Sequence, residues 1–299
     1  MSTGACPGRR PGTATPFALR PARIRRVLIA DDPPLLAALE ALARDQRLVF
    51  FAGLPGTGKS LLIHQLAHLA HARGRRIHLL QWDVARPVFE ASEAGRRYPL
   101  DRGVTHGVIR LAVGRWARAA VARWHARHRG AEHLLIGETP FIGHRLIDLA
   151  RPAGDEAEPL LTSPATAFVI PVPSRVLREY LEAERERRAR EPLHPRERED
   201  APPEVLQALW RDLAGADVPY DPVVYQQAYE GLLRSRRAET LPLHARLRSH
   251  AMSVYDFAVE TADLLPGPDE VDRAIREVEA AYPTSEDVQR AIDGWRQPA

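Results

Sequence analysis

Five short apolar segments alternate with longer helical segments along the chain. The first covers residues 48–52, and the others follow at residues 77–82, 133–136, 167–170 and 240–243. Continuous apolar runs of this length are typical of strands that are buried on both faces. Because helical segments separate the strands, the pattern predicts an α/β fold in which a parallel sheet of five strands is covered on both faces.

Helical spacing of apolar residues predicts the elements between and beyond these strands. The expected helices cover residues 34–45, 61–72, 105–129, 174–191, 269–281 and 285–295. The Arg- and Glu-rich segment at about 174–203 is bracketed by prolines and is expected to form a helical lid over the sheet. We therefore expect a main domain at residues 27–266 and a helical C-terminal extension at residues 267–299.

The basic charge of the chain is concentrated at its start. The whole chain has 42 Lys plus Arg against 39 Asp plus Glu and a formal charge of +3, but residues 1–26 contain six arginines and no acid. The remaining chain is therefore slightly acidic. A Pro-, Gly- and Thr-rich composition predicts that residues 1–26 form a disordered basic tail. A nucleic-acid partner for this tail is the less favoured alternative to a solvated tail.

Cysteine content and hydropathy limit the cellular setting. Cys6 is the single cysteine, so the chain cannot form an intramolecular disulfide. The sequence contains no apolar run approaching the roughly 18 residues that span a bilayer, and its start lacks the apolar core of a signal peptide. We expect a cytoplasmic protein that has no membrane partner.

A glycine-rich loop follows the first predicted strand and precedes a predicted helix. Its sequence is Gly-Leu-Pro-Gly-Thr-Gly-Lys-Ser over residues 53–60, and chance would produce this spacing in roughly 3 of 10,000 chains of this composition. Glycines let successive N–H groups face an anion at a helix N-terminus. The expected nucleotide contacts are Gly53, Pro55, Gly56, Thr57, Gly58, Lys59, Ser60 and Leu61.

Lys59 is the only lysine in the chain, whereas the other 41 basic residues are arginines. A slim, flexible point charge suits the loop position better than a planar guanidinium. We expect Lys59 to contact the β- and γ-phosphates of a nucleotide, and we expect the hydroxyl of Ser60 to bind Mg²⁺.

Carboxylates and arginines follow the second and third predicted strands. Asp83 could accept a proton from an attacking hydroxyl, and Arg86 could hold an anionic acceptor; the alternative for Asp83 is a helix cap. Glu138 could order Mg²⁺ or polarise a substrate, and its alternative is a structural hydrogen bond. Arg145, a few residues further along, is included among the expected substrate contacts.

The segment after the fourth predicted strand is rich in arginine. Arginines that a closing lid brings to the moving phosphoryl group would neutralise its charge, and Arg185 and Arg188, which share a helix face, are our candidates. The alternative is a solvated helix, since Glu184 and Glu186 precede Arg188 and Arg190 at the i,i+4 spacing of favourable pairs.

These motifs together resemble the P-loop kinases of the nucleoside-kinase-like branch, which includes polynucleotide 5′-hydroxyl kinases, zeta-toxin-like kinases, adenylylsulfate kinases and antibiotic phosphotransferases. The resemblance covers about residues 47–250 and depends on the loop at 53–60, Asp83 with Arg86, Glu138 and the arginine-rich segment. It implies a three-layer P-loop NTPase fold with a five-stranded parallel sheet. It also implies ATP and Mg²⁺ as cofactors, Asp83 as general base, and lid arginines that contact the phosphates.

The sequence thus predicts an ATP-dependent phosphotransferase that transfers the γ-phosphate to a hydroxyl acceptor. A small molecule, a nucleoside and a polynucleotide end all remain open as acceptors. The alternative from another class is a nucleotide-dependent switch or regulatory ATPase that acts on a protein partner.

Histidines at positions 64, 68 and 71 follow helical spacing and could suggest a metal site. They lie opposite an apolar stripe and have no acidic residue among them, so we interpret them as exposed side chains rather than as ligands.

Overall fold

A parallel sheet of five strands forms the centre of the molecule. The computed structural model describes residues 32–101, 103–191, 203–215, 217–245 and 264–296. The strand order is β2-β3-β1-β4-β5. The strands are β1 (Leu48–Ala52), β2 (Arg76–Gln81), β3 (His133–Thr139), β4 (Thr166–Pro173) and β5 (Ala238–Leu243). Every neighbouring pair is parallel, so the predicted five-stranded parallel sheet is confirmed.

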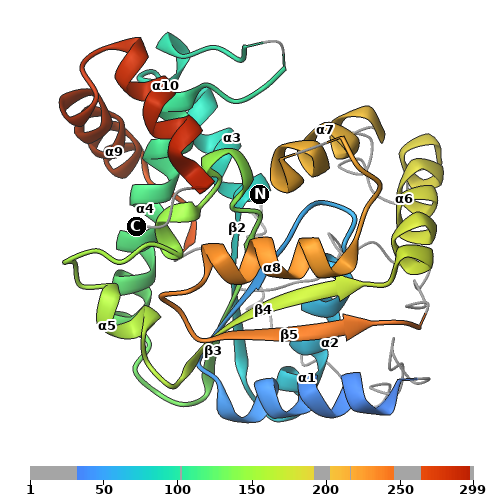
Figure 1. Cartoon of the computed structure of the whole chain (residues 1–299). Coiled ribbons are helices and arrows are strands. Elements are labelled where there is room, and N and C mark those ends of the chain that lie inside the picture. The colour runs from blue at the N-terminus through green and yellow to red at the C-terminus, as the bar shows by residue number, and fades with distance from the viewer. Residues whose placement is uncertain (1–31, 102, 192–202, 216, 246–263, 297–299) are drawn as a thin grey trace, which may run out of the picture.

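Helices cover both faces of the sheet (Figure 1). One face carries α1 (Pro33–Asp45), α2 (Lys59–Ala72) and α6 (Arg175–Arg190). The other carries α3 (Trp82–Ala91), α4 (Gly107–Arg127), α7 (Pro203–Ala214) and α8 (Pro222–Leu232), with the short α5 (Glu158–Leu161) beside them. The predicted α/β class with a covered sheet is therefore confirmed. The proposed tail at 1–26 and the part of the proposed lid at 192–202 lie outside the described residues.

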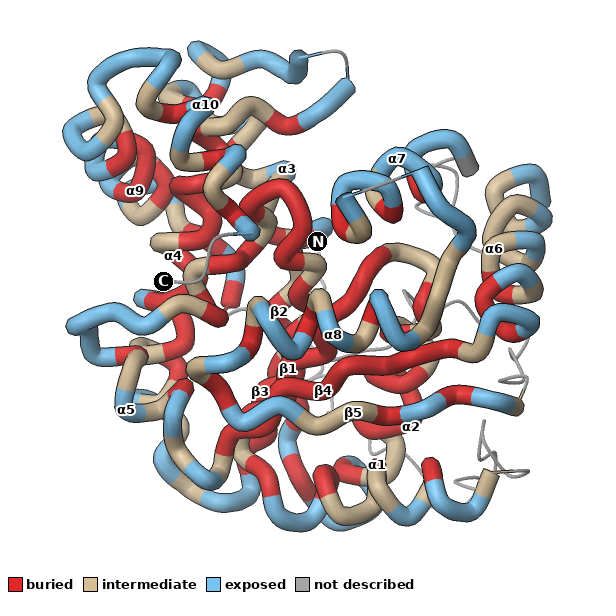
Figure 2. The backbone as a smooth tube through the Cα atoms, in the orientation of Figure 1, coloured by how far each residue is buried: buried red, intermediate tan, exposed pale blue. Residues whose placement is uncertain are grey.

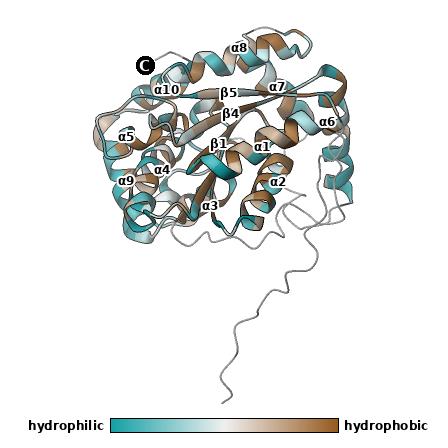
Figure 3. Cartoon of the chain, turned by 90° about the horizontal axis from the view of Figure 1, so that it is seen from below, coloured by the Kyte–Doolittle hydropathy of each residue, from teal (hydrophilic) through white to brown (hydrophobic). Residues whose placement is uncertain are grey.

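Both faces of the central strand β1 are apolar because each contacts its own helical layer. Val49 and Phe51 join the core beneath α1 and α2, whereas Leu48 and Phe50 join the core beneath α4 and α8. On the second face, Phe50 stacks on Phe168 of β4 with ring centroids 4.8 Å apart. Figure 2 shows buried residues continuing along these strands, and Figure 3 shows apolar residues on the strands and on the helices around them.

The two C-terminal helices pack on the outer side of α4. They are α9 (Pro268–Ala281) and α10 (Ser285–Asp293), and the helices predicted for this region are confirmed. Val271 and Ile275 of α9 belong to the same core cluster as the α4 face of the sheet. At the edge of that contact, Trp116 donates a hydrogen bond to Glu270 at 3.2 Å. These helices are therefore fixed to the layer that borders the candidate site.

At the end of the second predicted strand the structure has a helix instead. The apolar run was expected to extend the second strand through Trp82, but β2 ends at Gln81 and Trp82 is the first residue of α3. The Trp82 side chain packs into the core beneath α4. As for membranes, none of the helices in the described part of the chain is both long and apolar enough to cross one.

Candidate active site

The glycine-rich loop connects the carboxyl end of β1 to the first turn of α2. Gly56 and Gly58 have φ angles of 77° and 84°, in the left-handed region where a side chain would be strained. Gly58 is the N-cap of α2, and Lys59 is its first residue. The loop therefore curls around the N-terminus of a 14-residue helix, a position where backbone N–H groups and the helix dipole can bind an anion.

Gly53 allows a close approach between the loop and α8. A Cβ atom at Gly53 would lie 2.4 Å from the hydroxyl oxygen of Tyr225, which is fully buried. Burial raises the pKa of Tyr225, so this hydroxyl keeps its proton. It makes no hydrogen bond of good geometry with the described residues. No role for Tyr225 follows from the sequence, because only the packing of α8 brings it to the loop.

Lys59 is buried inside the loop that it follows. Its side chain is 4% exposed, and its Nζ donates a hydrogen bond to the carbonyl of Leu54 at 2.8 Å. Burial lowers the pKa of Lys59 from 10.5 to about 8, and the nearby Glu138 carboxylate opposes that change. The ammonium group is thus held by a carbonyl of its own loop, and this bond can be exchanged for an anion that enters the loop.

Glu138, on the third predicted strand, lies next to the glycine-rich loop. It lies on β3, where it is aligned with Phe51 of β1 and Gln81 of β2. Its Oε1 is 3.7 Å from Lys59 Nζ, and its Oε2 accepts a long hydrogen bond of 3.4 Å from Gln81. Burial raises the pKa of Glu138, and Lys59 opposes that rise. The structure therefore brings together Lys59 and Glu138, which are 79 positions apart in the sequence.

Asp83 is in the first turn of α3 and is exposed. The N-cap of α3 is Gln81, so Asp83 is not the cap that we considered as its alternative role. It is close enough to Lys59 and Glu138 to influence the pKa of each. An exposed carboxylate beside a buried lysine is available to an incoming molecule.

Arg86, one turn along α3, has a protein partner. It forms an ion pair with Glu90 at 3.0 Å, and Glu90 also accepts a hydrogen bond from Thr105 at 2.9 Å. Its Nε atom has no hydrogen-bond partner among the described residues. The guanidinium is therefore oriented by Glu90.

A tightly bent segment after β3 positions Arg145. Phe141, His144 and Leu146 have positive φ angles of 61°, 66° and 63°, which is rare for residues with side chains. Phe141 and Leu146 are fully buried, so packing holds this backbone in place. The bend directs Arg145 toward Asp83, which opposes the lowering of the Arg145 pKa that burial causes.

Arg110 of α4 meets Arg145 across Gly143. Arg110 donates a hydrogen bond to the carbonyl of Gly143 at 2.8 Å. A Cβ atom at Gly143 would lie 3.0 Å from Arg145 Nη1 and 3.3 Å from Arg110 Nη1. Burial, followed by the repulsion from Arg145, lowers the pKa of Arg110 to about 10. Sequence reasoning missed Arg110 because it begins a helix with many arginines, and no local signal separates it from the solvated ones.

Helix α6 carries the predicted lid arginines. Arg185 lies close enough to Lys59 to lower its pKa, whereas Arg188, together with Arg187, lowers the pKa of Glu184. Arg178, which we had not chosen, is buried and is bound to Glu182 at 2.5 Å. A Cβ atom at Gly56 would lie 3.6 Å from Glu182 Cγ. Of the two predicted arginines, the structure thus brings Arg185 to the loop.

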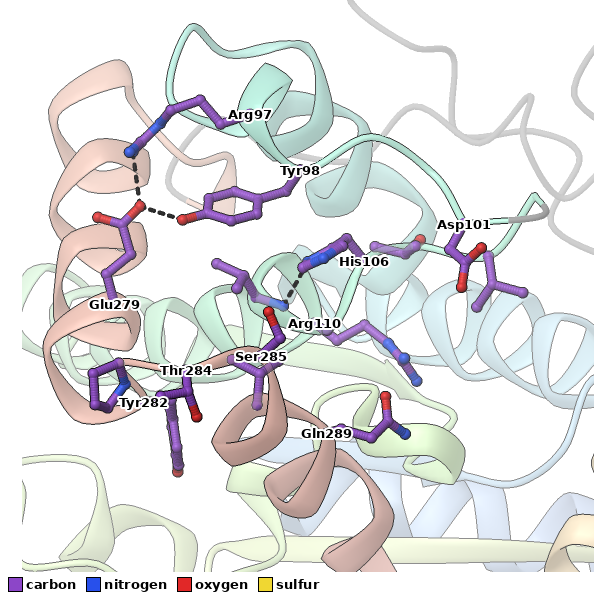
Figure 4. A pocket seen from close by; sticks show the side chains of 16 residues that line it. Arg97, Tyr98, Asp101, His106, Arg110, Glu279, Tyr282, Thr284, Ser285 and Gln289 are labelled. Carbon is purple, nitrogen blue, oxygen red and sulfur yellow. Dashed lines mark hydrogen bonds and ion pairs between the residues drawn. The ribbon is translucent and has the colours of Figure 1, made fainter.

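A cavity of about 420 Å³ adjoins Arg110 (Figure 4). Thr105, just before α4, and Arg110, in the first turn of α4, line it, and residues of α9 and α10 close its other side. At one end, Glu279 accepts bonds from Arg97 at 2.9 Å and from the Tyr98 hydroxyl. In Figure 4 the guanidinium of Arg110 points away from that end. Arg110 therefore borders both the cavity and the segment that carries Arg145.

The assembled site combines a loop that can bind an anion, a buried lysine beside a carboxylate, an exposed carboxylate and a pair of arginines. Such an arrangement can bind a polyanion at the loop and a second anionic molecule beside it, with Asp83 available to accept a proton. No family model, no curated protein and no solved structure matches this chain.

Proposed function

We propose that the protein is an ATP-dependent phosphotransferase of the P-loop class that transfers the γ-phosphate of ATP to a hydroxyl of an anionic acceptor. The observation that carries the proposal is the convergence of Lys59, Glu138 and Asp83 at the carboxyl edge of the sheet. Ligands of open parallel sheets bind at this edge.

The nucleotide would bind in the glycine-rich loop. The phosphates would accept hydrogen bonds from loop N–H groups, and Lys59 would exchange the Leu54 carbonyl for a phosphate oxygen. The hydroxyl of Ser60 and the carboxylate of Glu138 are the oxygen donors that would hold Mg²⁺, which supplies charge neutralisation of the phosphates when bound. Release of Lys59 toward the phosphates would leave Glu138 without its cation and favour a metal beside it.

The acceptor would lie between Asp83 and the arginine pair. Asp83 would accept the hydroxyl proton while the acceptor oxygen forms a bond to the γ-phosphorus and the bond to the β–γ bridging oxygen breaks, releasing ADP. Arg110 and Arg145 are desolvated cations that repel one another, so an anionic group on the acceptor would relieve that repulsion. Arg86 would add a third donor, and the cavity would accommodate the remainder of the acceptor.

Charge on the moving phosphoryl group would be neutralised from α6. Arg185 lies beside Lys59, and Arg178 is held on the same helix by Glu182. An arginine fixed there can stabilise the transition state without reorganising, and exclusion of water would prevent hydrolysis of ATP.

The test is a comparison of Asp83→Asn with the exposed control Asp217→Asn. Hydroxyl acceptors that carry a phosphate, sulfate or carboxylate are screened for ADP formation above the background without acceptor. We expect Asp83→Asn to keep its MgATP affinity within about threefold and to lose about 10²- to 10⁴-fold in transfer, with the control unchanged. Acceptor-independent turnover that is equal in both variants would instead identify a nucleotide-dependent switch.

A further inference from the structure

Three histidines from separate parts of the chain meet beneath the end of α4. His78 is on β2, His128 is the C-cap of α4, and His133 is the first residue of β3. His78 and His133 lie on the sheet face that α4 covers. Their neighbours along each strand belong to the core on the opposite face, and successive side chains of a strand point to opposite faces. His133 begins its strand, so this cluster lies toward the opposite end of β3 from Glu138.

The ring nitrogens of this cluster are already close together. One nitrogen from each ring lies within 4.8 Å of the others. His78 Nε2 and His133 Nδ1 are 3.0 Å apart, and the His128 ring centroid lies 4.5 Å from each of the other two. Tetrahedral Zn²⁺ with bonds of about 2.0–2.1 Å places its ligand nitrogens about 3.3 Å apart. Small ring rotations would therefore bring all three nitrogens onto one ion.

We propose that His78, His128 and His133 form a binding site for a divalent late transition metal, with Zn²⁺ as the expected ion. Neutral imidazole is a favoured ligand of zinc, and three imidazoles leave the fourth tetrahedral position for water. His78 and His133 are 1% and 8% exposed, so both rings are held by their surroundings. Zn²⁺ would replace the hydrogen bond between these two rings with bonds to both.

The surroundings of the cluster fit a metal site. His133 Nε2 lies 3.5 Å from a carboxylate oxygen of Glu132, so the His133 nitrogen that does not face His78 has an acidic neighbour. Carboxylates in this position orient metal-bound imidazoles and raise their basicity. The end of α4 also favours a cation because the helix dipole is negative there.

Arg47 fixes the histidine that comes from α4. Its guanidinium donates to the carbonyl of Arg129 at 2.7 Å and to the carbonyl of His128, and it lies over the ring of Trp124. The donors of Arg47 are thus directed to backbone oxygens at the end of α4. The position of His128 is set before a metal binds, which reduces the ordering that binding requires.

Zn²⁺ in this site would connect α4 to β2 and β3 at the end of the sheet away from Asp83. We expect the bound ion to raise the stability of this layer. The proposed metal site does not depend on the proposed phosphotransferase activity. A metal that binds only the folded chain raises the melting temperature in proportion to the logarithm of its concentration.

The test uses the full, tag-free chain after treatment with EDTA and dialysis. After Zn²⁺ is added back and the excess is removed, we expect one Zn²⁺ per chain by elemental analysis. We also expect a higher melting temperature with added Zn²⁺ and a visible d–d absorption when Co²⁺ is used instead. The variants are His128→Asn and His78→Gln, with His71→Asn on the exposed end of α2 as the matched control.

We expect each cluster variant to lose about 100-fold in Zn²⁺ affinity while His71→Asn retains it. A cooperative melting transition of each variant without zinc is the control that it is folded. Absence of stoichiometric binding to the wild-type chain, or equal affinity in His128→Asn and His71→Asn, would overturn the proposal and leave a hydrogen-bonded histidine cluster only.

Discussion

The ammonium group of Lys59 lies 3.7 Å from the carboxylate of Glu138 and also donates to the carbonyl of Leu54. Lys59 is the first residue of α2 and Glu138 is on β3, so this pair connects the glycine-rich loop to the neighbouring strand. Lys59 is buried and Glu138 is partly buried, and each opposes the pKa change that burial causes in the other. The pair is therefore sensitive to pH and to any anion that enters the loop.

The stability of the protein should depend on pH through Lys59. Burial lowers its pKa from 10.5 to about 8. Below pH 8 the folded and unfolded chains both carry this proton, and burial of the charged group then lowers the free energy of unfolding by its full amount. As pH rises from 8 toward 10.5 the folded chain loses the proton first, so stability due to Lys59 should increase, by up to about 3 kcal/mol. Urea unfolding of wild type and Lys59→Met between pH 7.5 and 10 measures this contribution, and a constant difference would contradict it.

Gly53→Ala should destabilise the fold because its Cβ would lie 2.4 Å from the Tyr225 hydroxyl oxygen. Overpacking of a buried contact costs about 1–3 kcal/mol in the free energy of unfolding. Removing that hydroxyl in the double variant Gly53→Ala/Tyr225→Phe should recover most of the loss. Thermal and urea unfolding of the two single variants and the double variant form the cycle. If the effects of the two changes on the free energy of unfolding are additive, the contact with the Tyr225 hydroxyl is not what destabilises a side chain at residue 53.

Arg145→Met should stabilise the ligand-free protein by about 1 kcal/mol because it removes a desolvated guanidinium next to that of Arg110. The gain should be larger in 20 mM than in about 300 mM salt, since salt screens like-charge repulsion. The exposed Arg44→Met is the control and should change stability by less than about 0.5 kcal/mol. A loss of stability in Arg145→Met at low salt would show that its hydrogen bond to Ile142 outweighs the repulsion.

Glu138→Gln should raise the Mg²⁺ concentration that gives half-maximal ATP turnover by about tenfold, because an amide is a weaker ligand for a hard cation than a carboxylate. The hydrogen bond from Gln81 can be kept by the amide oxygen. Glu239→Gln, on the edge strand β5, is the control. A magnesium dependence equal to that of wild type would assign Glu138 to the positioning of Lys59 alone.

The inner strands β1, β3 and β4 were predictable because they are buried on both faces and are therefore apolar runs in the sequence. Leu48–Ala52 was predicted to the residue, whereas the second strand was extended over Trp82, an apolar residue that packs from a helix instead. An apolar side chain indicates burial but does not indicate which element buries it.

The glycine-rich loop was predictable because its residues are contiguous and the positive φ angles of Gly56 and Gly58 require glycine. Arg110 and Tyr225 were not predictable, since α4 and α8 bring them to the loop and the segment after β3 from distant positions. The histidines also divide into a set that is visible in the sequence and a set that only the fold brings together. The visible stripe at His64, His68 and His71 lies along one helix, where His71 is exposed as expected but His64 is buried. The compact cluster is made of residues whose spacing has no pattern.

The sequence by itself determined the alternation of strands with helical segments, the location of the loop and the residues near the carboxyl ends of the strands. Those properties follow from local periodicity and from the direction that parallel strands share. Only the tertiary structure decided that Lys59 lies near Glu138, that Arg110 and Arg145 lie on either side of Gly143, and that three histidines meet beneath α4. Contacts between distant segments depend on how helices pack on the sheet, and that packing is set by the whole core rather than by any one segment.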